Sequence, residues 1–144
     1  MASEKRTTSF SARFSRRLVE RLNAHSGRVG QSNARVAERL IDEGLQMEEF
    51  PGIVFRTGPT GRRAGIAGGP DVWELVRDVR GAVLAGADDP IDVVHRTTGV
   101  DRSKIELAVD YYAAYPDDVN ARIRSADEAA ERVRRALGGA APAA

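Results

Sequence analysis

The run Ser9-Phe10-Ser11-Ala12-Arg13-Phe14-Ser15, near the start of the 144-residue chain, decides the fold that we expect of its first third. Apolar and polar residues alternate along this run, which is the period of a β-strand with one apolar and one polar face. A strand this short, with two aromatic side chains on one face, needs a partner edge and a surface that buries them. The sequence passes from this run straight into helix, with no second strand beside it, so the pattern predicts pairing with the same strand of a second copy.

Two helices are expected directly after this run. Ser15 suits the N-cap of the first helix, which Gly27 is expected to close, and Ser32 suits the N-cap of the second, after a turn at Gly30. Both helices carry an apolar stripe at helical spacing. The stripe positions are Leu18, Val19, Leu22 and Val29 in the first helix, and Val36, Ala37, Leu40, Ile41 and Leu45 in the second.

The order strand, helix, helix resembles the ribbon-helix-helix family of bacterial repressors and antitoxins, the MetJ, Arc and CopG group. The resemblance rests on the strand alternation, Arg13, the cap at Ser15 and the turn Gly30-Gln31-Ser32. The family often has Pro at the position of Ser15, and both residues suit a helix start. The resemblance implies a homodimer whose two-stranded ribbon enters the major groove of double-stranded DNA at a palindromic operator.

The polar face of such a ribbon would meet the base pairs, because the apolar face is needed inside. Its residues are Ser9, Ser11 and Arg13. Arg13 is the strongest candidate, since a guanidinium can bond a guanine edge bidentately, and such a pair contributes about 1–3 kcal/mol of discrimination. The two serines are adaptable donors and acceptors, so they select bases less strictly.

Candidate phosphate contacts surround the ribbon. The resemblance places the start of the second helix against the DNA backbone, where N–H groups and the helix dipole attract an anion. Two cations precede the strand, and two arginines in the first turn of the first helix oppose its dipole, so that a phosphate would explain them. Solvated surface arginines are the alternative explanation. The candidates are Lys5, Arg6, Arg16, Arg17, Gln31, Ser32 and Asn33.

Charge and composition agree with a nucleic-acid-binding first part. Residues 1–45 carry nine Lys and Arg against five Asp and Glu, a balance of +4, whereas residues 46–144 carry 13 against 16, a balance of −3. A basic front with a mildly acidic remainder points to nucleic acid as the partner of the front. No apolar run is long enough for a signal peptide or a membrane span, so we expect a cytoplasmic protein.

The sequence contains no set of residues typical of a catalytic site. The chain has no Cys, which removes disulfides, thiolate zinc sites and cysteine nucleophiles. His25 and His95 have no second ligand at metal-site spacing. The glycine-rich run 58–69 lacks the Gly-Lys-Ser or Gly-Lys-Thr ending of a phosphate loop, so it predicts a hairpin turn. We therefore expect no enzymatic activity, no metal and no cofactor.

The remainder predicts a hairpin followed by helices. Strands are expected at 53–55 and 63–66, and helices at 70–83, with Asp71 in its first turn, at 90–96 and at 102–115. A second resemblance rests on these parts. Gly61-Arg62-Arg63, Pro90-Ile91-Asp92-Val93-Val94, Tyr111-Tyr112 and Tyr115-Pro116-Asp117-Asp118 are similar to a small winged-helix-like domain of unknown function found in antitoxins. The hairpin departs from the usual Gly-Thr-Arg, and the resemblance implies a PIN-like ribonuclease toxin as partner.

The last predicted helix, capped by Asp117, carries a narrow heptad stripe suited to another helix or a groove. The stripe could dock on its own domain, form a dimer contact or bind a toxin. Its candidate partner-binding residues are Val119, Ile123, Val133 and Leu137.

The expected fold class is α+β, mainly helical with short strands. Residues 1–50 would form a ribbon-helix-helix DNA-binding and dimerisation domain, residues 51–137 a winged-helix-like domain with a hairpin and a long terminal helix, and residues 138–144 a disordered tail. The expected function is a homodimeric transcriptional repressor, the antitoxin of a type II toxin–antitoxin pair that represses its own promoter. The alternatives are a stand-alone transcription factor whose second domain binds a ligand or strengthens the oligomer, and a scaffold that binds protein alone.

Overall fold

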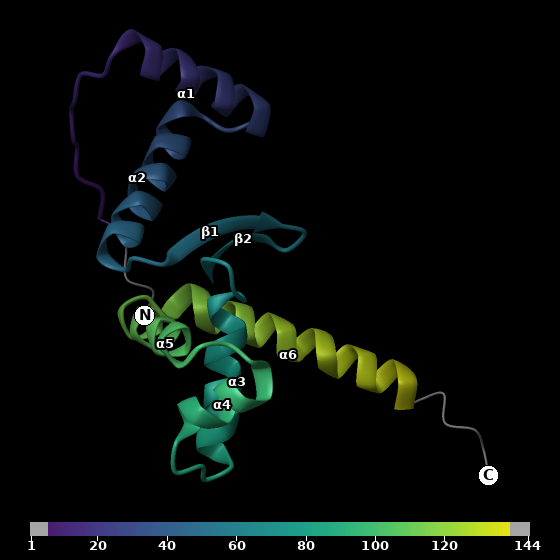
Figure 1. Cartoon of the computed structure of the whole chain (residues 1–144). Helices are drawn as coiled ribbons and strands as arrows, with labels where there is room; N and C mark the ends of the chain where they lie inside the picture. The colour runs from purple at the N-terminus through teal and green to yellow at the C-terminus, as the bar shows by residue number, and fades with distance from the viewer. Residues whose placement is uncertain (1–5, 139–144) are drawn as a thin grey trace. The chain divides into compact units, whose positions relative to one another are not determined.

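The chain is mainly helical with one small antiparallel sheet, as the computed structural model of residues 6–138 shows (Figure 1). This confirms the α+β class. Lys5 and residues 139–144 of the predicted tail lie outside the described residues. The internal contacts divide the chain into two units, Met1–Gly44 and Leu45–Ala144.

The first unit contains α1, Arg16–Val29, and most of α2, Asn33–Glu49. The predicted N-cap at Ser15 is confirmed, because its hydroxyl accepts a hydrogen bond from the N–H of Leu18 at 3.3 Å. Gly27 was wrongly expected to close α1. The helix continues to Val29, and Gly30 ends it, since Gly30 adopts the left-handed conformation (φ 65°) that glycine accepts without strain.

The division between the units falls within α2 and not at the predicted boundary after residue 50. The last turn of α2 packs with the second unit, where the Tyr111 hydroxyl donates to Gln46 Oε1 at 2.5 Å and the ring of Phe50 meets that of Tyr111 edge-on. Because α2 continues without a break across the boundary between the units, local sequence patterns do not indicate where that boundary lies.

The second unit begins with a hairpin of β1, Ile53–Gly58, and β2, Gly61–Ile66. The strands pair in register from Ile53 opposite Ile66 to Gly58 opposite Gly61, which leaves Pro59 and Thr60 as the turn. The predicted hairpin is confirmed, and both strands are longer than the predicted ranges 53–55 and 63–66.

Helices complete the second unit. They are α3, Val72–Leu84; α4, Pro90–Thr98; α5, Arg102–Ala114; and α6, Pro116–Gly138. Asp71 is the N-cap of α3 and not a member of its first turn, because it forms a capping box with Glu74. Likewise Asp117 does not cap α6 but lies in its first turn, after Pro116.

One hydrophobic core joins the hairpin to α3, α4, α5 and the start of α6. Its fully buried residues include Ile53, Ile66, Val72, Leu75 and Ile105. Val119 and Ile123 of α6 belong to the same core. Their assignment as partner-binding residues is therefore corrected: they pack inside their own unit and leave only Val133 and Leu137 of the predicted set exposed.

The described helices were also searched for a membrane span. Within residues 6–138, none is both long and apolar enough to cross a membrane.

Candidate nucleic-acid interface

The predicted base-reading residues lie on an extended segment that leads into α1 (Figure 1). Ser9, Ser11 and Arg13 are all exposed, and so are the aromatic residues between them, with Phe10 84% and Phe14 57% exposed. In the single chain, residues 6–15 belong to no strand. The physical reason is that a strand obtains its hydrogen bonds only from a partner edge. The two-stranded ribbon, which would need one strand from each of two copies, therefore stays a prediction.

The start of α1 is electrostatically open to an anion. Its first turn contains no acidic residue, while Arg16 and Arg17 are both exposed. Arg16 lies 3.8 Å from the carboxylate of Glu20, and both side chains are mostly in solvent, so this pair is weak. The helix dipole and the two guanidinium groups therefore act in the same direction, toward binding negative charge.

The start of α2 is partly engaged within the first unit. The Gln31 N–H donates to the Ser26 carbonyl at 3.1 Å, and the Asn33 amide donates to the side chain of Asn23. The Ser32 hydroxyl accepts from the N–H of Arg35 at 3.2 Å, which confirms Ser32 as the predicted N-cap. That hydroxyl keeps its own hydrogen for a further acceptor. The first turn of α2 also has no acidic residue.

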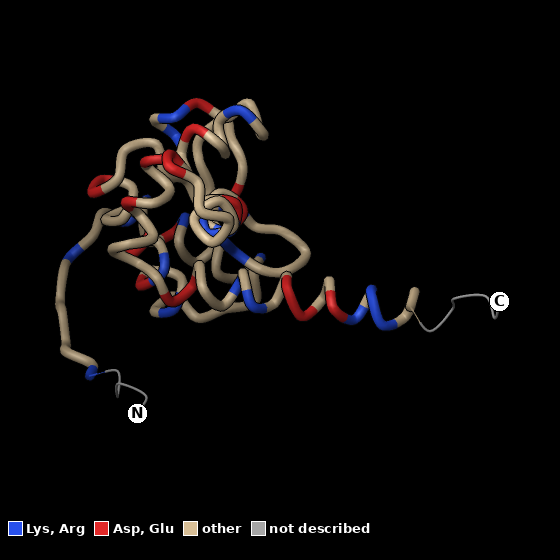
Figure 2. Tube along the Cα trace, turned by 90° about the horizontal axis from the view of Figure 1, so that it is seen from below, with Lys and Arg blue, Asp and Glu red and all other residues tan. Residues whose placement is uncertain are grey.

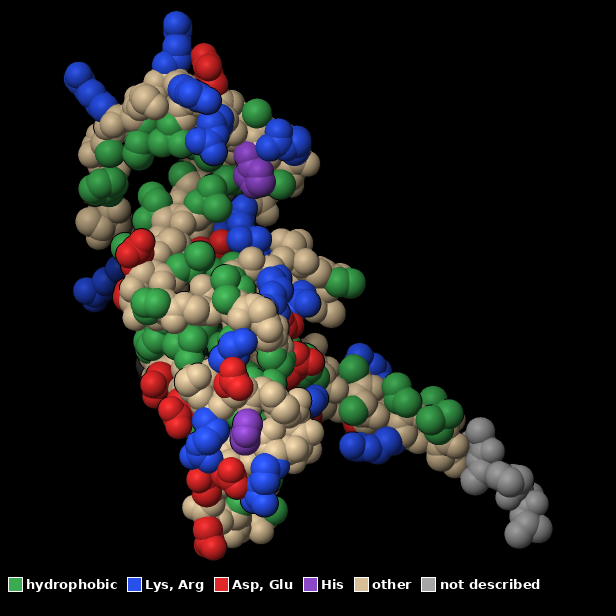
Figure 3. Space-filling view, in the orientation of Figure 1, with side chains coloured by type: hydrophobic (Ala, Val, Ile, Leu, Met, Phe, Trp, Pro, Cys, Tyr) green, Lys and Arg blue, Asp and Glu red, His purple; other side chains and the backbone are tan. Residues whose placement is uncertain are grey.

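The apolar stripes of α1 and α2 remain largely uncovered. Val36 is fully buried, but exposed apolar side chains remain on both helices, namely Leu18, Val19, Val29, Leu40 and Ile41. A hollow of about 370 Å³ lies between apolar side chains that include Leu18, Leu22 and Leu40. Arg21, His25 and Arg28 also line it. Figure 3 shows the green apolar side chains gathered over α1 and α2 of this unit. The first unit thus leaves much of its apolar surface in solvent.

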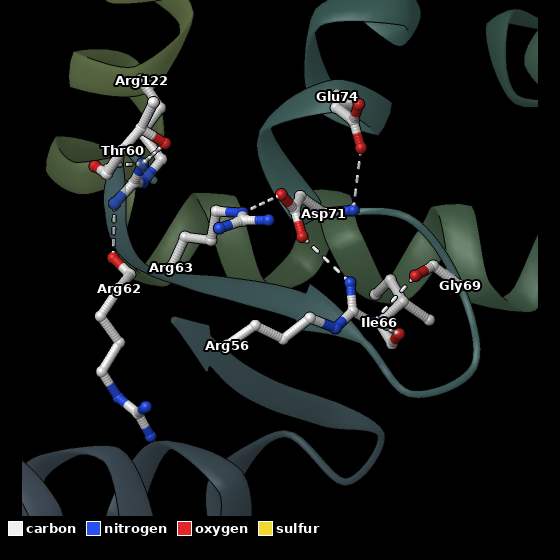
Figure 4. A network of polar contacts seen from close by, with 9 residues as sticks. All are labelled: Arg56, Thr60, Arg62, Arg63, Ile66, Gly69, Asp71, Glu74 and Arg122. Atoms are coloured by element: carbon white, nitrogen blue, oxygen red, sulfur yellow. Dashed lines mark hydrogen bonds and ion pairs between the residues drawn. The ribbon is translucent and has the colours of Figure 1, made fainter. Parts of the chain in front are cut away.

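The second unit contains a polar network that sequence reasoning missed (Figure 4). Asp71, 7% exposed, accepts from Arg56 Nη1 at 3.0 Å and from Arg63 Nε. Arg56 also donates to the carbonyl oxygens of Ile66 and Gly69. Because Arg56 and Arg63 are direct cross-strand partners, two like charges stand opposite each other, and an anion between them resolves the repulsion.

The available signal for this network was the hairpin register. Two arginines that face each other across β1 and β2 favour a carboxylate nearby, and Asp71 comes five residues after the end of β2. The tip of the same hairpin is held by Arg122 of α6, which donates to the Thr60 carbonyl at 3.3 Å and to the Arg62 carbonyl. These contacts hold the hairpin to the start of α3 and to α6, so we interpret the network as structural support. Arg63 Nη1 is buried without a hydrogen-bond partner among the described residues.

Two further titratable groups, His95 and Asp89, make contacts within the second unit. His95 Nδ1 lies 2.7 Å from the Val100 carbonyl oxygen, which ties α4 to the following turn. The pKa of Asp89 lies below its ordinary value because the Asp92 N–H donates to its carboxylate, with Arg102 adding to the effect. Among residues 6–138, no three His, Asp or Glu side chains gather closely enough to hold a metal ion.

Comparisons with protein-family models, with curated proteins and with solved structures find no match to this chain.

Proposed function

We propose that this chain is a homodimeric, sequence-specific DNA-binding repressor. The observation that carries the proposal is the first unit itself: two capped helices with uncovered apolar faces, preceded by an exposed segment of alternating polar and aromatic residues. A second copy would supply both missing parts, a strand edge for residues 9–15 and apolar surface for α1 and α2.

The charge of the first unit supports DNA as its ligand. Its cations outnumber its acids, and the starts of α1 and α2 both lack acidic residues in the first turn. Within a two-fold ribbon, Ser9, Ser11 and Arg13 would face the major groove. The phosphate contacts would come from Arg6, Arg16 and Arg17 and from the Gln31-Ser32-Asn33 turn.

The second unit would contact a protein, and the leading role is that of an antitoxin that binds a PIN-like ribonuclease. This part rests on the resemblance to antitoxin domains of winged-helix-like fold. In this chain the hairpin precedes α3 to α6. If the role is correct, the neighbouring reading frame encodes a small ribonuclease-like protein.

One observation favours the alternative of a stand-alone transcription factor. Antitoxin segments that bind toxins are often disordered until bound, whereas residues 53–123 form a unit with its own buried core. A neighbouring frame that encodes no such ribonuclease would support this alternative and leave DNA binding by the first unit intact.

The test of DNA binding is a salt-resolved titration on the DNA upstream of the chain's own reading frame. We expect wild type to bind specifically and Arg13→Ala to lose about 5- to 150-fold of its preference over random DNA while keeping most of the salt dependence. Arg17→Ala should weaken specific and random DNA about equally and lower the salt slope by about one.

Arg124→Ala, which removes the same charge from the exposed surface of α6, is the matched control and should bind like wild type. Equal binding by wild type and Arg13→Ala would overturn the proposed ribbon and favour a scaffold that binds protein alone.

A further inference from the structure

The second half of α6 extends beyond the core of its unit. Val119 and Ile123 are buried, but Val133 is 56% and Leu137 70% exposed. Residues 124–138 span about 22 Å at the rise of an α-helix, and Figure 1 shows this part of α6 continuing past the helices around it. The element is therefore half core and half free helix.

The apolar stripe continues along the free half. Ala126, Ala130, Val133 and Leu137 follow at steps of four, three and four, so they share one face of the helix. The stripe has two small residues followed by two larger ones. A helix that covered it would fit best with its large residues against the two alanines.

Charge along the same segment is also divided. After Arg124, acidic Asp127, Glu128 and Glu131 precede basic Arg132, Arg134 and Arg135, as the red and blue bands near the end of α6 show in Figure 2. The ion pairs within the segment, Arg134 with Glu131 at 3.2 Å and Arg135 with Glu131 at 3.6 Å, are largely exposed and weak. In an antiparallel pair of two such segments, the acidic part of each would therefore lie beside the basic part of the other.

We propose that the free half of α6 pairs with the same segment of a second copy, side by side and antiparallel. In this register Leu137 of one copy lies against Ala126 of the other, and Val133 lies against Ala130. Asp127 then flanks the seam opposite Arg134 of the second copy, and the same pair occurs twice by symmetry.

The antiparallel direction follows from both patterns. In a parallel pair, alanine would meet alanine and leave a gap, and Asp127 of one copy would lie too far from Arg134 of the other to pair with it. In the antiparallel pair every layer combines a small with a large side chain, and the folded units lie at opposite ends of the seam. A seam of about three turns is weak alone. It therefore rests on the dimer proposed for the first unit, which would hold the two copies of α6 at a high local concentration.

Cysteine cross-linking tests the register, and the absence of Cys from the chain makes each introduced thiol unambiguous. We expect Ala126→Cys/Leu137→Cys to form a disulfide-linked dimer under mild oxidation. The two sites lie about 16 Å apart within one helix, too far for a disulfide inside one chain. The single variants Ala126→Cys and Leu137→Cys should stay largely unlinked, because each cysteine faces a different residue.

Charge reversal in the same double-cysteine chain tests the flanking pairs. Asp127→Arg alone or Arg134→Asp alone should lower the cross-linked fraction several-fold, and the two together should restore it. Glu128→Arg, one position away on the outer side of α6, is the matched control and should leave cross-linking unchanged. Circular dichroism would verify that each exposed substitution preserves the helix.

Three results would overturn the proposal. Strong cross-linking of the single variants would indicate a parallel pair. An absence of cross-linking in the double variant, at a protein concentration where the chain sediments as a dimer, would show that the stripe covers no second copy and would point to a different protein partner. A failure of the combined reversal to restore what each single reversal removes would reject the proposed register.

Discussion

Asp71 is a buried acidic residue that joins the hairpin of the second unit to α3. It is the N-cap of α3, where its N–H donates to Glu74, and its carboxylate separates two arginines that the hairpin register places opposite each other. Its side chain is 9% exposed, against 33% for Arg56 and 22% for Arg63. Removing the negative charge would leave two half-buried cations facing each other.

Asp71→Asn isolates this charge, because Asn has the same size and is an equally good N-cap. We expect the free energy of unfolding to fall by about 2–3 kcal/mol, since a largely buried ion pair loses one partner. Chemical denaturation of the full chain measures the loss. Asp78→Asn removes a carboxylate from an exposed pair with Arg77 and should change stability by less than about 0.5 kcal/mol. Similar effects of both substitutions would refute the role assigned to Asp71.

Gly65 makes room for the arginine that reaches Asp71. A Cβ at this position would lie 2.7 Å from Cζ of Arg56, closer than side-chain contacts allow. We expect Gly65→Ala to displace the guanidinium and to lower the free energy of unfolding by about 1–3 kcal/mol. Gly81→Ala, in α3 with no heavy atom within 4 Å of the added carbon, should be neutral or stabilising by up to about 1 kcal/mol.

A double variant checks the explanation for Gly65. Gly65→Ala and Asp71→Asn act on the same arginine, so their combined loss in denaturation should be smaller than the sum of the two. Fully additive losses would contradict a shared mechanism.

At the scale of elements, α6 shows that one continuous stripe can serve two purposes. Its first turns complete the core of the second unit, and its last turns contribute no buried side chain to it. The steps of four and three are the same in both halves. The two halves differ only in their position, because α6 is longer than the core on which its first turns pack.

Truncations on this stripe should therefore differ in effect. We expect Ile123→Ala to lower the free energy of unfolding by about 2–4 kcal/mol, since it leaves a cavity in the core. Val133→Ala should cost less than about 0.5 kcal/mol at low protein concentration, where no second copy covers it. Thermal or chemical denaturation at micromolar concentration makes the comparison. Equal losses would mean that the last turns also pack on the unit.

At the scale of the whole molecule, the two units differ in how far they cover their own apolar surface. The second unit has a continuous core from the hairpin to α6. The first has fully buried Val36 but leaves the stripes of α1 and α2 largely exposed. If the first unit dimerises as proposed, association would cover these stripes and stabilise it.

Hydrogen exchange of the full chain can separate the units. We expect protection of peptides from residues 16–44 to rise with protein concentration, because association buries α1 and α2, while protection of α3 and α5 stays constant. Leu40→Asp should abolish the concentration dependence. Leu84→Asp, at a leucine 88% exposed in the second unit, is the control and should leave it unchanged. Protection in residues 16–44 that is independent of concentration would contradict the proposed dimer.

Several features were predictable because they depend on neighbours in sequence. The caps at Ser15 and Ser32 and the two-stranded hairpin follow from local backbone chemistry. The errors at Gly27 and Asp71 are shifts at helix ends, where several residues can serve as a cap. The candidate DNA-contacting residues of the described chain were found to be exposed, and their role depends on a ligand.

By itself the sequence determined the α+β class, the order of the elements from α1 to α6 and several of their ends, since each depends on interactions across a few residues. Only the tertiary structure decided which apolar stripes are covered. It placed Val119 and Ile123 in a core and left Val133 and Leu137 in solvent, divided the chain inside α2, and brought Asp71 between Arg56 and Arg63. These outcomes depend on surfaces that come from distant parts of the chain, and periodicity along one helix carries no information about them.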